Sequence, residues 1–246
     1  MRTKLLVLAA ALAPVATFAA GGELHLDAAN VDVTNKASLQ RGAANFVNYC
    51  LGCHSAQYVR YNRMAADIGI TEQQLIDNLM FTGERPHDLM KIGINRDDAL
   101  RWFGVVPPDL SLIARSRGAD YVYTFLRSFY ADPAKASGWN NTVLPGTAMP
   151  HVLWELQGIQ EAVWAGEPNA AGDVRHEFKE FKIATPGKMT AEEYDAFVRD
   201  TVNFLVYIGE PAQLQRRALG VPVIAFLVFF TLLAYAMKKE YWKDVK

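Results

Sequence analysis

The most informative stretch of this 246-residue chain is Cys50-Leu51-Gly52-Cys53-His54. Cysteines three positions apart lie on one face of a helix, and here a histidine directly follows the second one. In this C-x-x-C-H pattern the two thiols bond to the vinyl groups of a haem and the imidazole binds the iron. The motif predicts one covalently attached haem c, held through Cys50 and Cys53, with His54 as an axial ligand.

Other uses of two cysteines fit this sequence less well. A structural C-x-x-C disulfide would close only a very short loop. A thioredoxin-like redox pair sits at a helix start after a strand, whereas residues 45–49 resemble the end of a helix. A zinc site needs two further ligands at matching spacing, and the chain has only two cysteines. Haem attachment is therefore the favoured interpretation.

A haem used for electron transfer needs a sixth iron ligand, for which the chain offers several methionines and histidines. The candidates are Met64, Met80, Met90, Met149, Met189, His25, His87, His151 and His176. Met149 stands out because Leu144-Pro145-Gly146-Thr147-Ala148-Met149-Pro150 lacks helical or strand periodicity, so its prolines and glycine can form an extended loop beside a porphyrin. His/Met ligation raises the reduction potential relative to bis-imidazole ligation. Met149 is the predicted ligand, and His151 or an open iron are the alternatives.

The N-terminus has the layout of a secretory signal peptide. Arg2 and Lys4 precede an apolar stretch over residues 5–15, and small residues then lead to a predicted cleavage site near Ala19. We expect residues 1–20 to be the signal peptide, with retention as an uncleaved anchor as the alternative. The residues that follow are therefore expected in the bacterial periplasm.

The C-terminal region predicts a single-pass membrane anchor over residues 216–246. Residues 218–237 carry no charge, and 20 helical residues span roughly 30 Å, the thickness of the hydrocarbon core. A buried core helix is the alternative, but this segment has no polar face. The lysine-rich tail after residue 237 favours a cytoplasmic C-terminus in the inner membrane.

The segment between signal peptide and anchor, residues 21–215, is long enough for one folded domain with insertions or for a small pair of domains. It carries 17 Lys and Arg against 24 Asp and Glu, a net charge of −7. An acidic surface disfavours nucleic acid and favours encounter with a basic protein, although an acidic face without any partner is equally common.

Apolar periodicity predicts an all-α domain with long loop insertions. One helix ends at Cys50, with Ser38 available as its N-cap, and capping boxes begin at Thr71 and Thr190. Two connections, residues 131–150 and 164–189, are rich in Gly, Pro and Ala and are expected to be long loops.

Several stretches together resemble the cytochrome c1 family. These are Val106-Pro107-Pro108-Asp109-Leu110-Ser111, Gly118-Ala119-Asp120-Tyr121-Val122, Ala148-Met149-Pro150, and a helix ending in Gly209-Glu210-Pro211 before a terminal anchor. The interval of 95 positions between His54 and Met149 is also typical of this family, whereas small soluble c-type cytochromes have a much shorter one. Each stretch is weak by itself, but their order is specific.

The resemblance implies a class I cytochrome c-like haem domain in the bacterial quinol:cytochrome c oxidoreductase. Cys50 and Cys53 would carry the haem, His54 and Met149 would be the axial pair, and Arg101 would neutralise a propionate. The partners implied are cytochrome b, the Rieske iron-sulfur protein as electron donor, a soluble or tethered cytochrome c as acceptor, and membrane lipid. The chain would relay electrons without bond chemistry of its own. A free-standing tethered carrier or oxidase subunit, and a haem sensor with an open iron, are the alternatives.

Overall fold

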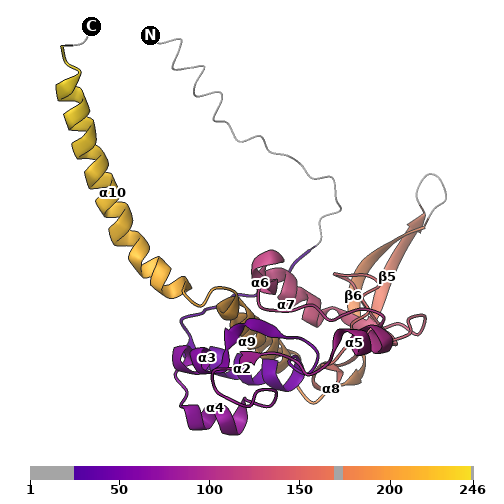
Figure 1. The fold of residues 1–246 in the computed structure, drawn as a ribbon. Helices are drawn as coiled ribbons and strands as arrows, with labels where there is room; N and C mark the ends of the chain where they lie inside the picture. The colour runs from indigo at the N-terminus through magenta and orange to yellow at the C-terminus, as the bar shows by residue number, and fades with distance from the viewer. Residues whose placement is uncertain (1–24, 169–173, 245–246) are drawn as a thin grey trace.

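The computed structural model describes residues 25–168 and 174–244 of the chain. A folded body contains α2 to α9, and α10 leaves this body as one long helix (Figure 1). The β5–β6 hairpin projects from the body at another side (Figure 1). The predicted signal peptide, residues 1–20, lies outside the described residues.

Helices form most of the body, and their starts follow from capping side chains. Asn35 caps the first described helix by accepting a hydrogen bond from the Ser38 N–H, so the expected cap at Ser38 is wrong by one turn. The capping boxes at Thr71 and Thr190 are both confirmed. The helices are α2 (Lys36–Tyr49), α3 (Tyr61–Ile68), α4 (Glu72–Asn78), α5 (Arg96–Phe103), α6 (Ile113–Ser116), α7 (Ala119–Arg127), α8 (Trp154–Gln157), α9 (Ala191–Gly209) and α10 (Gln213–Tyr241).

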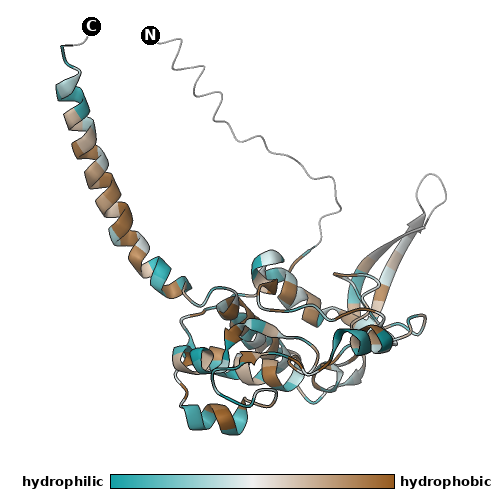
Figure 2. Ribbon diagram, in the orientation of Figure 1, coloured by the Kyte–Doolittle hydropathy of each residue, from teal (hydrophilic) through white to brown (hydrophobic). Residues whose placement is uncertain are grey.

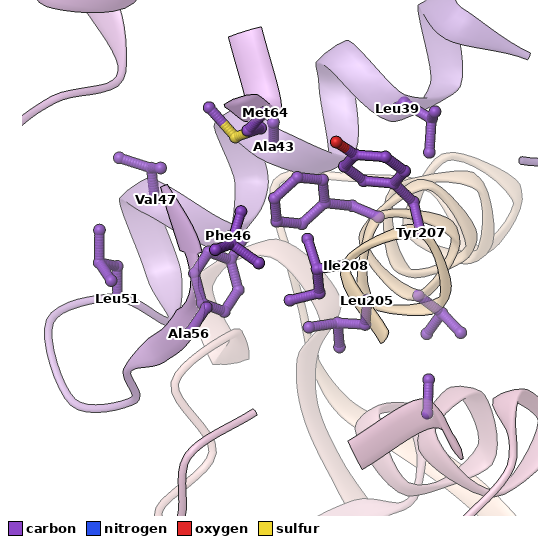
Figure 3. Packing of buried hydrophobic residues seen from close by; sticks show 14 of the residues in the cluster. Leu39, Ala43, Phe46, Val47, Leu51, Ala56, Met64, Leu205, Tyr207 and Ile208 are labelled. Atoms are coloured by element: carbon purple, nitrogen blue, oxygen red, sulfur yellow. The ribbon is translucent and has the colours of Figure 1, made fainter. Parts of the chain in front are cut away.

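The core lies where α2 packs against α9 (Figure 3). Phe46 and Phe204, both fully buried, meet with ring centroids 5.5 Å apart. Around them lie aliphatic side chains from α2, α3 and α9, and burial of this apolar surface is the main stabilising contribution. The packing places the C-terminal end of α2, and thus the C-x-x-C-H stretch, on a rigid support.

A buried polar cluster ties the same two helices together. The carboxylate of Asp200 on α9 accepts hydrogen bonds from Ser38 Oγ at 2.6 Å and from Arg41 Nε at 2.5 Å. Asn203 Nδ2 donates to Ser38 Oγ at 2.9 Å and to the carbonyl oxygen of Asp32 at 2.8 Å. Ser38 is therefore not the N-cap of α2, and its hydroxyl instead forms hydrogen bonds that join α2 to α9.

The expectation of an all-α domain is not confirmed, because the described residues also form three antiparallel two-stranded sheets. Their strands are β1 (Ala56–Arg60) with β2 (Leu89–Met90), β3 (Phe129–Ala131) with β4 (Trp139–Asn141), and β5 (Gly158–Pro168) with β6 (Val174–Pro186). The last pair occupies most of the connection expected to be a loop over residues 164–189. Trp164, Phe178 and Phe181 form a contiguous aromatic row on it, which favours strands despite the Gly and Pro content.

The terminal helix α10 has the dimensions of a membrane anchor. Within the described residues it alone is long and apolar enough to cross a bilayer, and its 29 residues extend about 44 Å. Apolar residues cover its middle, and polar residues gather at its ends (Figure 2). The predicted span over residues 218–237 lies inside this helix, and none of its apolar window is buried by the folded body.

Candidate functional site

One cavity of about 520 Å³ opens between the end of α2, α7, α9 and the loop before α8. Its wall is mainly apolar and includes Pro107, Phe125, Leu126 and Phe197. The volume falls within the range of about 300–1,000 Å³ found for pockets that enclose cofactors. Four of the predicted site residues also line the cavity, namely Cys50, Cys53, His54 and Met149.

The two cysteines line the cavity as free thiols on a tight turn after α2. The N–H groups of Cys53 and His54 both donate to the carbonyl oxygen of Cys50, at 3.1 and 2.8 Å, so the three residues stay together. Burial raises the pKa of the Cys50 thiol to about 12. A thiol that stays protonated is a poor redox nucleophile, so Cys50 does not suit thioredoxin-like chemistry.

The imidazole of His54 is held in one orientation by the loop that follows α5. Its Nδ1 lies 2.8 Å from the carbonyl oxygen of Pro108, and because a carbonyl only accepts, Nδ1 carries the proton. Burial lowers the pKa of His54, which favours the neutral ring. The Nε2 lone pair is then free for a metal ion, in the arrangement typical of metal-binding histidines.

Among the candidate sixth ligands whose side chains are described, only Met149 lines the cavity. Met64 and Met90 are fully buried in the core, where methionine commonly fills irregular gaps. His151 lies two positions from Met149 but is not part of the cavity wall, since its ring stacks on Phe129 with centroids 5.0 Å apart. Burial lowers the pKa of His151 to about 4.

The structure does not bring Arg101 to the cavity. Its guanidinium donates to Asp98 at 2.5 Å on the exposed side of α5, because the two residues lie one helical turn apart. Among the arginines whose side chains the structure describes, Arg117 is the one that lines the cavity, with its guanidinium 5.5 Å from the ring centroid of Tyr121. In the sequence, Arg117 could have been recognised as a site residue from its position directly before the Gly118–Val122 stretch.

Comparison with known proteins assigns the chain to a family. The profile of the Cytochrome C1 family matches residues 28–176 and 185–245. A cytochrome c1 of Allochromatium vinosum is 51% identical over 245 residues, which cover 100% of both chains. The chain belongs to the cytochrome c1 family. It is a membrane-anchored, haem-carrying electron-transfer subunit of the cytochrome bc1 complex, with one covalently bound haem c.

Two further relatives show how far the likeness extends. A protein of Nitrosomonas europaea named ammonia monooxygenase gamma subunit is 48% identical over 242 residues, which cover 98% of each chain. The cytochrome c1 of Rhodospirillum rubrum is 26% identical over 242 residues, which cover 86% of this chain and 83% of that protein.

The residues of the cavity fit a haem c. Two free thiols, an oriented imidazole and a thioether line a mainly apolar space, and Arg117 supplies a cation at its wall. Thioether bonds, iron coordination and propionate neutralisation need these donor types.

Proposed function

We propose that Cys50 and Cys53 attach the haem, and that His54 and Met149 are the axial ligands of its iron. The observation that carries this proposal is that one apolar cavity receives all four side chains, although 95 positions separate His54 from Met149. With both axial positions taken, small molecules have no free coordination site, which suits electron transfer. We also propose that the domain is class I cytochrome c-like, since its N-terminal helix α2 packs on its C-terminal helix α9.

The haem supplies one-electron oxidation and reduction when it is bound. The protein tunes and protects this chemistry. Pro108 keeps the His54 ring oriented and more basic through the Nδ1–H hydrogen bond, and the apolar wall excludes water. Arg117 is the side chain that we assign to a propionate, in place of Arg101, because its guanidinium stands at the cavity wall.

The proposed path takes electrons from the Rieske iron-sulfur protein to a soluble or tethered cytochrome c, with cytochrome b as the membrane neighbour. The net charge of −7 over residues 21–215 supports a basic acceptor and argues against nucleic acid as a partner. Lipid surrounds α10, whose apolar middle is free of protein contacts within the described residues.

The proposed topology places residues 21–215 in the periplasm and the C-terminus in the cytoplasm. The N-terminal layout of residues 1–20 supports export of the haem domain. Lys238, Lys239 and Lys243 follow the span and support a cytoplasmic tail.

The decisive experiment is an optical spectrum of the purified haem protein with Met149 intact and with Met149→Ala. Loss of the methionine should remove the methionine-to-iron charge-transfer band of the oxidised form and allow carbon monoxide to bind the reduced form. A spectrum and carbon monoxide reactivity unchanged by the substitution would exclude Met149 as a ligand and would favour an open-iron sensor.

A second candidate function keeps the haem chemistry but changes the partners. The observation that favours it is the name of the Nitrosomonas europaea relative, ammonia monooxygenase gamma subunit, which assigns that protein to another complex. Mild detergent extraction separates the two. A cytochrome bc1 subunit should purify with a b-type haem protein and an iron-sulfur protein, whereas a free-standing carrier or oxidase subunit should purify without them.

A further inference from the structure

Two adjacent asparagines stand at the start of the loop that carries Met149. Asn140 and Asn141 end β4, where they pair with Tyr130 and Phe129 of β3. Asn140 is 7% exposed and Asn141 is fully buried. Buried amides need hydrogen-bond partners, so what these two side chains contact shows what they hold in place.

The side chain of Asn141 folds the first turn of the loop. Its Oδ1 accepts from the N–H groups of Val143 at 2.9 Å and Leu144 at 3.1 Å. Its Nδ2 donates to the carbonyl oxygen of Phe125 on α7 at 2.8 Å. Leu144 and Phe125 both line the cavity, so one buried amide joins the loop to the part of the cavity wall that α7 forms.

The side chain of Asn140 holds the middle of the same loop. Its Oδ1 accepts from the Gly146 N–H at 2.8 Å, and its Nδ2 donates to Asp132 at 2.9 Å. Gly146 has a φ of +78°, a conformation that favours glycine, and it lies three positions before Met149. Asn140 therefore fixes the turn from which Met149 enters the cavity.

The other end of the loop is held by packing on the same small sheet. His151 is buried between the rings of Phe129 and Trp139, at centroid distances of 5.0 and 5.1 Å. The segment between Asn141 and His151 is thus attached at both ends to β3 and β4, while Leu144, Pro145 and Gly146 are exposed. In an exposed loop without strand or helix periodicity, the asparagine side chains replace the missing backbone partners.

We propose that Asn140 and Asn141 are positioning residues that keep the Met149 sulfur at the haem iron. This inference rests on the proposed function, because it assumes Met149 as the sixth ligand. Loss of either amide oxygen leaves one or two loop N–H groups without a partner and loosens the loop. The cost of such a loss raises the population with methionine off the iron by roughly tenfold or more.

The test compares Asn140→Ala and Asn141→Ala with Asn203→Ala in the mature, full-length haem protein. Asn203 is a suitable control because it is 1% exposed and its side chain donates two hydrogen bonds, but these bonds tie α9 to Asp32 and Ser38 instead of to the loop. The readouts are the methionine-to-iron charge-transfer band and the rate of carbon monoxide binding to the reduced form. Thermal unfolding of all three variants measures the loss of stability separately.

We expect both loop variants to weaken the band and to bind carbon monoxide at least about tenfold faster, and Asn203→Ala to do neither at a similar loss of stability. Loop variants that behave like Asn203→Ala would overturn the inference. If alanine at 141 prevents maturation, Asn140→Ala decides, since it removes the acceptor of the Gly146 N–H and should still weaken the band.

Met149→Ala distinguishes a failure of the positioning role from a failure of the proposed ligation by Met149. A band that disappears in Met149→Ala but survives in both asparagine variants contradicts only the positioning role. A band that was never dependent on Met149 contradicts the proposed ligation itself.

Discussion

Gly42 on α2 and Asp200 on α9 approach so closely that a Cβ on Gly42 would lie 2.0 Å from the carbonyl oxygen of Asp200. Only hydrogen fits in that space, so this glycine sets how near the two helices pack. Because α2 carries the haem cysteines at its end, the contact also sets where the attachment site lies relative to α9.

Gly42→Ala should therefore destabilise the folded domain. The added methyl group forces the helices apart, and overpacking of this kind costs about 1–3 kcal/mol or more. Denaturant unfolding of the matured protein measures the loss. Gly93→Ala is the control because a Cβ there meets nothing within 4 Å. Equal stability of the two variants would contradict the close packing.

Removing both cysteines should abolish covalent haem attachment. In Cys50→Ala/Cys53→Ala no thiol remains to form a thioether, so a denaturing gel stained for haem should show no colour at the mass of the chain. Each single variant keeps one thiol and should retain a weaker band. Full staining of the double variant would refute attachment at these residues.

Arg117 and Arg101 should differ in their effect on the midpoint potential. A cation at the cavity wall favours the reduced haem, which carries one positive charge less, so Arg117→Gln should lower the potential. An interaction of about 1 kcal/mol corresponds to roughly 40 mV for a one-electron couple. Arg101→Gln should leave the potential unchanged, since Arg101 pairs with Asp98 away from the cavity. Redox titration of both variants checks this, and the opposite order would restore Arg101 as the propionate partner.

Tyr194 should make the stability of the domain fall in alkaline solution. Its hydroxyl donates to the carbonyl oxygen of Leu126 at 2.9 Å, and burial raises its pKa above the ordinary value. A raised folded-state pKa means that the stabilisation is complete below the unfolded pKa of about 10 and is lost as pH rises above it. Tyr194→Phe should be about 1 kcal/mol less stable than the native chain near pH 8. This deficit should shrink by about pH 11. Urea unfolding at both pH values tests the trend, and a pH-independent deficit would contradict it.

Electron transfer to a basic cytochrome c should slow as salt is added. The net charge of −7 over residues 21–215 attracts a cationic partner at long range, and ions screen that attraction within about 10 Å at 0.1 M salt. Stopped-flow rates across a range of ionic strengths measure the effect. A rate that does not depend on salt would count against an acidic docking face.

The sequence alone determined the features that depend on neighbouring residues. The haem motif, the capping boxes at Thr71 and Thr190 and the uncharged segment 218–237 are local, because one helical turn or one continuous helix contains all the interacting groups. Met149 could also be singled out, since the prolines and glycine around it exclude regular structure.

Only the tertiary structure decided what depends on distant segments. The β5–β6 hairpin is built from cross-strand pairs, and most of it lies in residues 164–189, the connection expected to be a loop, so composition predicted the wrong element there. Arg117 lies just before α7, and residues of α7 and α9 line the cavity, so Arg117 reaches the cavity wall. Arg101 does not, because it lies on α5 and pairs with Asp98. Asn141 donates a hydrogen bond to the carbonyl oxygen of Phe125, 16 positions away. This bond forms only when α7 and β4 pack together, so the sequence does not show the role of Asn141. Such contacts depend on how whole helices and strands pack, and local patterns in a single sequence do not reveal that packing.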